Sequence, residues 1–211
     1  MSLSTFILFW FSLTTLFIFK TLNETLKPGA PALANARFEI IAAPKASLDA
    51  AAAEARTQGY MVHRLGDALE GEARDLGRVH ARLALEARRK GERSAILSGG
   101  ELTVTVTGNG SGGPSQEYAL GLAIGLDGAP GISVLAADTD GIDGGGGQAD
   151  DPAGALVFPD TLARARALGN DAAAFLANND STAFFRALGD LVEVGPTQTN
   201  VNDFRVILID P

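Results

Sequence analysis

The 211-residue chain contains no cysteine, two histidines and one tryptophan. Without cysteine it can form no disulfide, no cysteine-ligated zinc site and no thiol nucleophile. His63 and His80 stand apart from any second ligand at metal-binding spacing, so we expect both to be structural. Positive charge is also scarce, because 17 Lys and Arg face 25 Asp and Glu and leave a net charge of −8. This acidic balance argues against nucleic acid as a partner, since a nucleic-acid-binding protein presents a basic surface to phosphates.

Charge and glycine are distributed unevenly along the chain. Residues 94–211 contain four arginines, no lysine and 15 acidic residues, and 16 of the 25 glycines lie between Gly99 and Gly154. An acidic protein that handles anions does so through a metal ion or through backbone N–H groups. We therefore expect the functional site in the second half of the chain.

Residues 1–22 form a hydrophobic segment that differs in composition from the rest of the chain. Residues 1–19 carry no charge and include five of the 11 phenylalanines and the only tryptophan. As a helix rising about 1.5 Å per residue they would just cross the ~30 Å core of a bilayer. The basic start and small-residue cleavage site of a signal peptide are absent. The segment is either a membrane anchor or, as its composition favours, the product of a mis-started reading frame; residues 23–35 follow as a Pro- and Gly-containing linker.

From residue 36 onward the pattern predicts an α/β fold. Residues 36–96 form a lead-in segment in which a strand at 37–43, a helix at 47–58 and a strand at 60–65 predict a parallel βαβ unit. An amphipathic helix from Leu69 to Gly91 ends this segment.

Residues 97–211 predict a mixed sheet with helices. The run 102–107 (LTVTVT) alternates apolar and polar residues, which is typical of a strand with one solvated face. Further strands are expected at 95–97, 132–136, 154–158, 191–194 and 204–209, and helices at 115–126, 160–168, 171–176 and 182–188.

The loop 108–113 (GNGSGG) matches the pattern G-x-G-x-x-G. It follows a predicted strand, precedes a predicted helix, and a later strand ends at Asp138, which is the order of a dinucleotide-binding unit. The strand before the loop alternates, however, whereas the first strand of a dinucleotide-binding fold is apolar on both faces. We therefore favour a flexible loop that contacts an anion or substrate over a nicotinamide-binding loop.

Asp138, Asp140 and Asp143 follow the buried strand 132–136, at the sheet edge where open α/β folds bind ligands. Clustered carboxylates repel one another unless a cation lies between them, so Mg²⁺ that holds a phosphate is the natural occupant. Capping of turns in a Gly-rich loop is the alternative. The polar stretches 178–181 and 195–203 either converge on the same place or cap their own loops.

Six blocks of sequence, in this order, resemble the C-terminal MOFRL domain of the glycerate 2-kinase family, whose members are also named hydroxypyruvate reductase. They are LSGGELTVTVTGNGSGG, SQEYALGLAIGL, LAADTDGIDG, TLARARALG, ANNDS and GPTQTNVNDFRVIL. The resemblance spans residues 27–211 and implies a cytoplasmic enzyme that uses ATP and Mg²⁺ to phosphorylate the 2-hydroxyl of D-glycerate, giving 2-phosphoglycerate. Family members carry a further N-terminal kinase domain, in whose place this chain has residues 1–22, so the resemblance implies a C-terminal fragment that could be inactive alone. An NAD(P)H-dependent hydroxypyruvate reductase and a non-catalytic remnant are the alternatives, and a membrane anchor at residues 1–19 is the alternative to the cytoplasm.

On this hypothesis the acids of the DTDGID block do the chemistry, because phosphoryl transfer depends on positioning and charge neutralisation. Asp138, Asp140 and Asp143 would be the catalytic acids, with Asp138 and Asp140 as Mg²⁺ ligands. The expected contacts to substrate or phosphate are Glu101, Gln116, Glu117, Asn179, Asp180, Thr197, Thr199, Asn200 and Asn202.

Overall fold

The structure, a computed structural model, describes residues 27, 29–35, 37, 39–144 and 147–211. The chain divides into two units, Met1–Ile41 and Ala42–Pro211. In the first unit the described residues include a turn and the short 3-10 helix η1 (Pro31–Leu33). The hydrophobic segment 1–22 lies outside the described residues. Within the part that is described, no helix combines the length and the apolar character that crossing a bilayer requires.

The second unit is a mixed α/β fold around a six-stranded sheet of order β1-β2-β6-β3-β4-β5. β1 and β2 pair in parallel, and every other neighbouring pair is antiparallel. The strands are β1 (Met61–Leu69), β2 (Ser94–Gly100), β3 (Ile132–Asp138), β4 (Gly154–Val157), β5 (Leu191–Val192) and β6 (Asp203–Ile209). The helices are α2 (Pro44–Thr57), α3 (Ala73–Arg89), α4 (Pro114–Leu126), α5 (Thr161–Ala167), α6 (Ala172–Ala177) and α7 (Ser181–Leu188).

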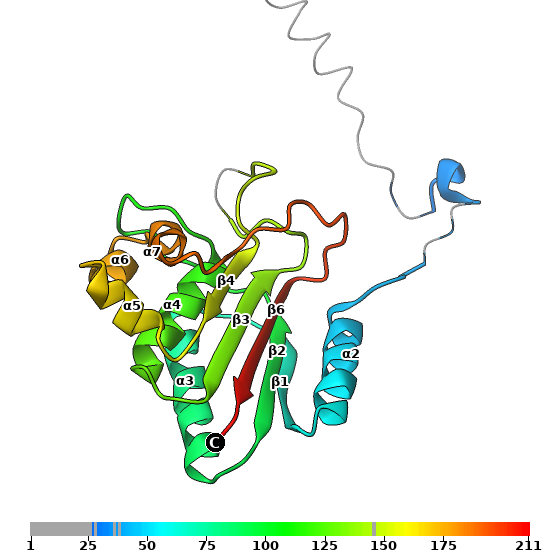
Figure 1. Cartoon of the computed structure of the whole chain (residues 1–211). Helices are drawn as coiled ribbons and strands as arrows, with labels where there is room; N and C mark the ends of the chain where they lie inside the picture. The colour runs from blue at the N-terminus through cyan, green and yellow to red at the C-terminus, as the bar shows by residue number, and fades with distance from the viewer. Residues whose placement is uncertain (1–26, 28, 36, 38, 145–146) are drawn as a thin grey trace, which may run out of the picture. The chain divides into compact units, whose positions relative to one another are not determined.

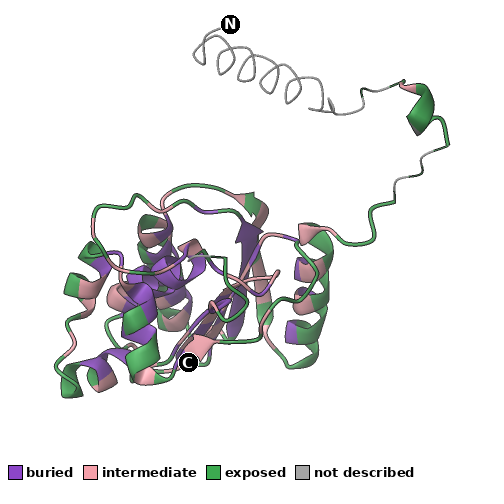
Figure 2. Cartoon of the chain, turned by 90° about the horizontal axis from the view of Figure 1, so that it is seen from above, coloured by how far each residue is buried: buried purple, intermediate pink, exposed green. Residues whose placement is uncertain are grey.

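The helices are divided unequally between the two faces of the sheet (Figure 1). α3, α4 and α5–α7 enclose the main core on one face, whereas α2 packs on the other face over β1 and β2. Figure 2 shows the buried residues gathered in the interior of this unit. α3 and α4 pack closely where Gly77 has no side chain, since a Cβ at Gly77 would lie only 2.3 Å from the carbonyl oxygen of Tyr118. The packing thus explains why glycine occurs inside a long helix, where it costs stability.

The α/β class and most predicted elements are confirmed, with two corrections. No strand occurs among the described residues of 37–43; the parallel βαβ unit lies one element later, as β1, α3 and β2. The run 102–107 is not a strand either and makes a single bridge, from Thr103 to Glu72. The Thr105 N–H and hydroxyl instead donate to the Glu72 carboxylate, so a side chain takes the place of a partner strand. The predicted boundary between residues 96 and 97 falls inside β2.

Candidate functional site

An acidic cluster forms at one edge of the sheet, where β2 and β3 end and β6 begins. The strand register places Asp203, the first residue of β6, opposite both Gly100 and Asp138. Glu101 follows directly after β2, and its charge raises the pKa of Asp138 and of Asp203. With Asp140 two residues beyond β3, four carboxylates therefore meet here. We call Glu101, Asp138, Asp140 and Asp203 the acidic cluster.

The loop 195–203 is tied to the loop 138–144 beside this cluster. The Thr139 hydroxyl donates to the carbonyl oxygen of Asn202 (2.8 Å), and the Thr197 N–H donates to the carbonyl oxygen of Asp140 (2.8 Å). The Asn200 side-chain amide lies 3.4 Å from the Asp140 carboxylate. Thr199 is exposed on the same loop, and its N–H donates to the Thr197 hydroxyl. The structure thus brings together the two polar stretches around Asp140 and Thr197 that the sequence marks.

Burial sets the electrostatics of the acidic cluster. Loss of solvent raises the pKa of Asp138, and the neighbouring Asp140 and Glu101 carboxylates raise it further against an opposing backbone hydrogen bond. The same desolvation raises the pKa of Asp203 to about 6, although the nearby Arg205 guanidinium lowers it. Asp138 and Asp203 therefore hold their protons more tightly than exposed aspartates do.

Arg205 is the buried cation beneath the cluster. Its side chain is 1% exposed, Nη1 donates to the Asp203 carboxylate (2.9 Å), and the guanidinium lies 5.4 Å from the Tyr118 ring centroid. The Tyr118 hydroxyl in turn lies 2.8 Å from His80 Nδ1, and burial lowers the pKa of His80 to about 4. His80 is therefore a neutral core residue at neutral pH, as predicted. Sequence reasoning missed Asp203 and Arg205 as site residues, although a lone arginine in the apolar strand FRVILI was a signal, because a buried charge needs a partner.

Asp143 has a different environment from Asp138 and Asp140. Its carboxylate is 2% exposed and accepts hydrogen bonds from the backbone N–H groups of Ser115 and Gln116 (both 2.8 Å). It thereby satisfies the N-terminus of α4 from a distant loop. Burial raises the pKa of Asp143 to about 7 against these hydrogen bonds, which lower it. The Gln116 side-chain NH₂ also donates to the Asp143 carboxylate (3.0 Å), and its side-chain oxygen accepts from the Thr182 hydroxyl (2.7 Å). Asp143 and Gln116 therefore join the acidic loop to α4 and α7.

Glu117, Asn179 and Asp180 belong to a second, separate polar assembly. The Asn179 side-chain oxygen accepts from the N–H groups of Thr107 (2.8 Å) and Gly108 (2.9 Å), and its amide donates to Glu117 (3.0 Å). Glu117 is buried and pairs with Arg74 from α3 (Nε–Oε1 2.6 Å). The Asp180 carboxylate accepts from the N–H of Ser111 (3.2 Å). These three predicted contact residues direct polar atoms toward their own chain.

The glycines of the loop 108–113 allow its backbone to press against residues 178–181. A Cβ at Gly108 would lie 2.3 Å from the Asn178 carbonyl oxygen, and one at Gly110 would lie 2.3 Å from the Asp180 Cβ. A Cβ at Gly112 would lie 2.1 Å from the Ser181 hydroxyl. Close packing within the protein therefore accounts for the G-x-G-x-x-G pattern without a nicotinamide dinucleotide.

The residues available for a metal ion are limited. Among the described residues, no group of three or more His, Asp or Glu side chains is arranged to hold one. Asp138 and Asp140 are close enough for their carboxylates to interact, which supplies at most a two-carboxylate site. Mg²⁺ is often held by one or two carboxylates together with substrate phosphates. The cluster thus fits a cation that arrives with phosphate ligands and does not form a complete protein cage.

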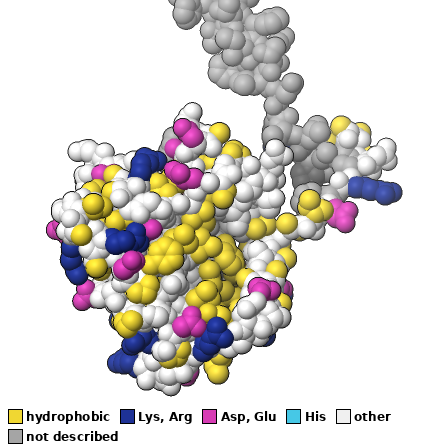
Figure 3. Space-filling view, viewed as in Figure 1, with side chains coloured by type: hydrophobic (Ala, Val, Ile, Leu, Met, Phe, Trp, Pro, Cys, Tyr) yellow, Lys and Arg dark blue, Asp and Glu magenta, His cyan; other side chains and the backbone are white. Residues whose placement is uncertain are grey.

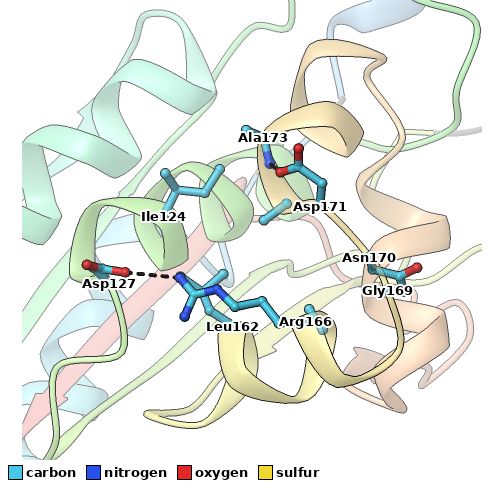
Figure 4. A pocket seen from close by; sticks show the side chains of 10 residues that line it. Ile124, Asp127, Leu162, Arg166, Gly169, Asn170, Asp171 and Ala173 are labelled. Atoms are coloured by element: carbon cyan, nitrogen blue, oxygen red, sulfur yellow. Dashed lines mark hydrogen bonds and ion pairs between the residues drawn. The ribbon is translucent and has the colours of Figure 1, made fainter.

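A separate hollow of about 410 Å³ lies among α4, α5 and α6 (Figure 4). Ile124 and Leu162 line it, and the Asp127–Arg166 ion pair (3.3 Å) lies along it. Asp171 also lines the hollow but caps α6 by accepting from the Ala173 N–H (2.9 Å). None of the predicted site residues lines this hollow.

The MOFRL family model matches residues 94–203, and the chain belongs to the MOFRL family. It is 51% identical over 193 residues to an Agrobacterium vitis protein named "Putative hydroxypyruvate reductase", covering 89% of this chain and 42% of that protein. It is 37% identical over 181 residues to the D-glycerate 2-kinase of Thermotoga maritima, covering 84% of this chain and 42% of the kinase.

A solved structure agrees with these sequence relationships. The crystal structure of a glycerate kinase from Thermotoga maritima superposes with a TM-score of 0.77 at 36% identity, over 82% of this chain and 42% of that one. The chain thus spans less than half the length of these relatives.

Proposed function

We propose that this chain is the C-terminal part of a glycerate 2-kinase, which transfers a phosphoryl group from ATP to the 2-hydroxyl of D-glycerate. The observation that carries the proposal is the acidic cluster, held by two tied loops in a chain that resembles kinases of this name. Because the chain spans 42% of those relatives, we propose that a second domain of the kind they carry completes the cleft. A cytoplasmic location is part of the same proposal.

The reaction joins the 2-hydroxyl oxygen to the γ-phosphorus, breaks the bond between that phosphorus and the bridging oxygen of ADP, and releases the hydroxyl proton. We assign that proton to Asp138, because burial raises the pKa of its carboxyl and a carboxylate with a higher pKa is a stronger base. Asp143, which is fixed on the N-terminus of α4, then acts as a positioning residue for the loop that carries Asp138.

Asp140 is the residue that we assign to Mg²⁺, with Asp138 as its neighbouring carboxylate. The Asn200 amide orients the Asp140 side chain, and the Thr197 N–H fixes its backbone. When bound, the cation would neutralise charge on the transferring phosphoryl group. Without such neutralisation, four carboxylates would repel both a nucleotide and glycerate, which are anions.

The loop 195–203 supplies donors for substrate oxygens. Thr199 and Asn200 have exposed side chains beside Asp140, and Asn202 is half-buried where the loop enters β6. Their hydroxyl and amide groups can donate to the carboxylate and hydroxyl oxygens of glycerate. The Thr197 hydroxyl already donates to the carbonyl oxygen of Thr139 (2.5 Å), so its role is to hold the loop.

The test is a chimaera in which this chain replaces the matching 181-residue region of the Thermotoga maritima kinase. We expect the folded chimaera to form ADP and 2-phosphoglycerate from ATP and D-glycerate, measured by coupled ADP release. Circular dichroism establishes folding, and the parent kinase is the positive control. A folded chimaera without kinase activity beside an active parent would overturn the proposal for this sequence.

The reductase alternative has its own readout. The relative in Agrobacterium vitis carries a reductase name, so the full chain and the chimaera are both assayed for NAD(P)H oxidation at 340 nm with hydroxypyruvate. We expect no oxidation, because packing against residues 178–181 already accounts for the glycines of the candidate nucleotide loop. Hydroxypyruvate-dependent oxidation by either protein would favour the reductase.

A further inference from the structure

Among the described residues, Arg205 is the only Lys or Arg that is buried. Figure 3 shows other Lys and Arg side chains at the surface, around a hydrophobic middle. The side chains of β6 alternate between the two faces of the sheet, and Asp203, Arg205 and Ile207 share the buried face. The register places Arg205 between Ser98 of β2 and Ala136 of β3. Because both neighbours are small, the long Arg205 side chain has room to lie along the sheet.

The guanidinium of Arg205 extends toward the acidic cluster. Nη1 donates to the Asp203 carboxylate (2.9 Å), which lies two residues nearer to the sheet edge, and Nε lies 3.4 Å from the Ser98 hydroxyl. The Tyr118 ring of α4 covers the guanidinium, with its centroid 5.4 Å from Cζ. Nη2 is buried and makes no hydrogen bond to any described residue. The ion-pair partner of Arg205 within the described chain is therefore a member of the cluster.

Stability alone does not account for a positive charge at position 205. Burial lowers the pKa of Arg205, although Asp203 and Tyr118 raise it, so the loss of solvation outweighs what the neighbours return. A buried ion pair often stabilises a fold no more than apolar side chains of similar volume would. Ile207 and Ile209 continue the same face of β6 with apolar side chains. An apolar side chain would therefore suit the core at this position.

Asp203 connects Arg205 to the rest of the acidic cluster. Asp203 lies directly opposite Asp138, and the Cβ atoms of such antiparallel pairs are about 5 Å apart. The Asp203 carboxylate also accepts a hydrogen bond from the Leu102 backbone N–H, next to Glu101. Like charges that face each other across a sheet repel. Without Arg205, we expect the Asp203 carboxylate to turn away from Asp138 and to release the Leu102 N–H.

We propose that Arg205 is a positioning residue for the acidic cluster, because its guanidinium holds the Asp203 carboxylate opposite Asp138 and against the Leu102 N–H. Its positive charge also offsets part of the repulsion among the carboxylates from beneath the cluster. Since Arg205 is buried, it acts through Asp203 and not by contact with substrate. The consequence for turnover rests on the proposed kinase function, whereas the consequence for the arrangement of the cluster does not.

The first test measures amide hydrogen exchange in the full chain by NMR. Arg205→Met removes the charge and keeps an unbranched side chain. We expect the protection of the Leu102 N–H to fall at least roughly 10-fold, because its acceptor is no longer held in place. The N–H groups of Ser115 and Gln116, which Asp143 binds, should keep their protection. Unchanged protection at Leu102, or an equal loss at all three amides, would overturn the proposal.

Two further variants separate the role of Arg205 from general stability. Arg205→Lys keeps the charge as a single point donor, so we expect it to retain part of the protection at Leu102. Arg164→Met is the matched control, because Arg164 binds the buried Asp190 (2.6 Å) and neither residue belongs to the cluster. It should leave the exchange of the Leu102 N–H unchanged. If circular dichroism shows that Arg205→Met does not fold, the neutral variant Arg205→Gln is measured by the same criterion.

The second test measures turnover in the kinase chimaera. For Arg205→Met we expect kcat to fall roughly 10- to 100-fold while KM for each substrate changes less than about threefold, because the cluster is displaced and no substrate contact is lost. Arg205→Lys should recover part of kcat, and Arg164→Met should keep it. In an Asp203→Asn background, Arg205→Met should lower kcat no further, since Arg205 acts through Asp203.

The outcomes distinguish this inference from the proposed function. An inactive chimaera with Arg205 in place would overturn the proposed function and the role in turnover, and the exchange of the Leu102 N–H would still decide whether Arg205 holds the cluster. An active chimaera whose kcat is unchanged by Arg205→Met would overturn the role of Arg205 in turnover. Additive losses in the Asp203→Asn background would show that Arg205 does not act through Asp203 and would overturn the proposal.

Discussion

The two tied loop pairs at the top of the sheet use similar residues for different purposes. Where the loop 108–113 meets residues 178–181, glycines admit close backbone contact and Asn179 directs its side-chain oxygen and amide to its own chain. Where the loop 138–144 meets residues 195–203, Asp138 and Asp140 gather with Glu101 and keep mutual repulsion. The polar side chains of the first loop pair bind within the chain and so stabilise the fold. The carboxylates of the second loop pair repel one another.

This difference separates structural from functional polar residues. Stability alone would not favour four neighbouring carboxylates, because burial and repulsion both disfavour their ionised forms. Repulsion between neighbouring carboxylates, next to a scaffold whose own polar groups are hydrogen-bonded, is typical of a ligand site. We therefore propose that Asn179 and Glu117 belong to the scaffold and that Asp138 and Asp140 take part in the chemistry.

Asp138→Asn should have the largest effect and should affect activity without affecting stability. In the kinase chimaera we expect kcat to fall roughly 10²- to 10⁴-fold, because the amide cannot accept the hydroxyl proton. Asp150→Asn, at an exposed acidic residue of the following loop, is the matched control and should retain activity. Coupled ADP release measures both, and urea unfolding should change by less than about 0.5 kcal/mol. Equal activity of the two variants would remove Asp138 from the chemistry.

Gly110→Val should have the largest effect on the scaffold. Its side chain would collide with the Cβ and Cα of Asp180, which lie 2.3 and 2.6 Å from a Cβ at this position. We expect a loss of roughly 3 kcal/mol or more in the free energy of unfolding, measured by urea denaturation. Gly169→Ala, where no atom lies within 4 Å, should lose only about 1 kcal/mol from its positive φ of 77°. Similar losses would show that the loop is free to move away.

Asn179→Ala should cost about 2 kcal/mol, since it leaves the N–H groups of Thr107 and Gly108 without a partner and removes one of the two side-chain partners of the buried Glu117, which keeps Arg74. Asn178→Ala is the control one residue away, because Asn178 is exposed and accepts one hydrogen bond from the Asn109 N–H. We expect its cost to be below about 1 kcal/mol. Thermal and urea unfolding measure both. An equal cost for the two variants would mean that backbone contacts alone, and not the Asn179 side chain, stabilise this loop pair.

The sequence predicted the elements whose signals are local. Apolar periodicity located α3 and α4, and the apolar runs located β3 and β6, because burial acts on each of these segments along its whole length. The alternation at 102–107 was misleading: Leu102 is buried but Val106 is 72% exposed, so the pattern does not reflect a buried face. A strand also needs a neighbour to pair with, and no local pattern records whether one is present.

The site was predictable where it depends on residue type and not where it depends on register. The DTDGID block predicted the acidic loop. The high density of Asn and Thr in residues 195–203 predicted the polar loop beside it. Asp203 joins the cluster only because β6 pairs with β3 so that it faces Asp138. Arg205 enters through the same pairing, two residues further along the strand. Long-range pairing, and not composition, therefore decided which charges meet.

Asp143→Asn should have the smallest effect. The sign of its effect on the pH dependence of unfolding distinguishes a structural role of Asp143 from a catalytic one. Burial raises the native pKa of Asp143 to about 7, from 3.8 for a free carboxyl, so the native state binds this proton more tightly than the unfolded state does. Its contribution to stability is therefore complete below about pH 4 and is lost as the pH rises toward 7. Between pH 5 and pH 8 we expect the unmodified chain to lose on the order of 1 kcal/mol more than Asp143→Asn, measured by urea unfolding. Asp150→Asn should retain the full pH dependence, and an unchanged slope in Asp143→Asn would mean that the three hydrogen bonds to Asp143 outweigh its desolvation.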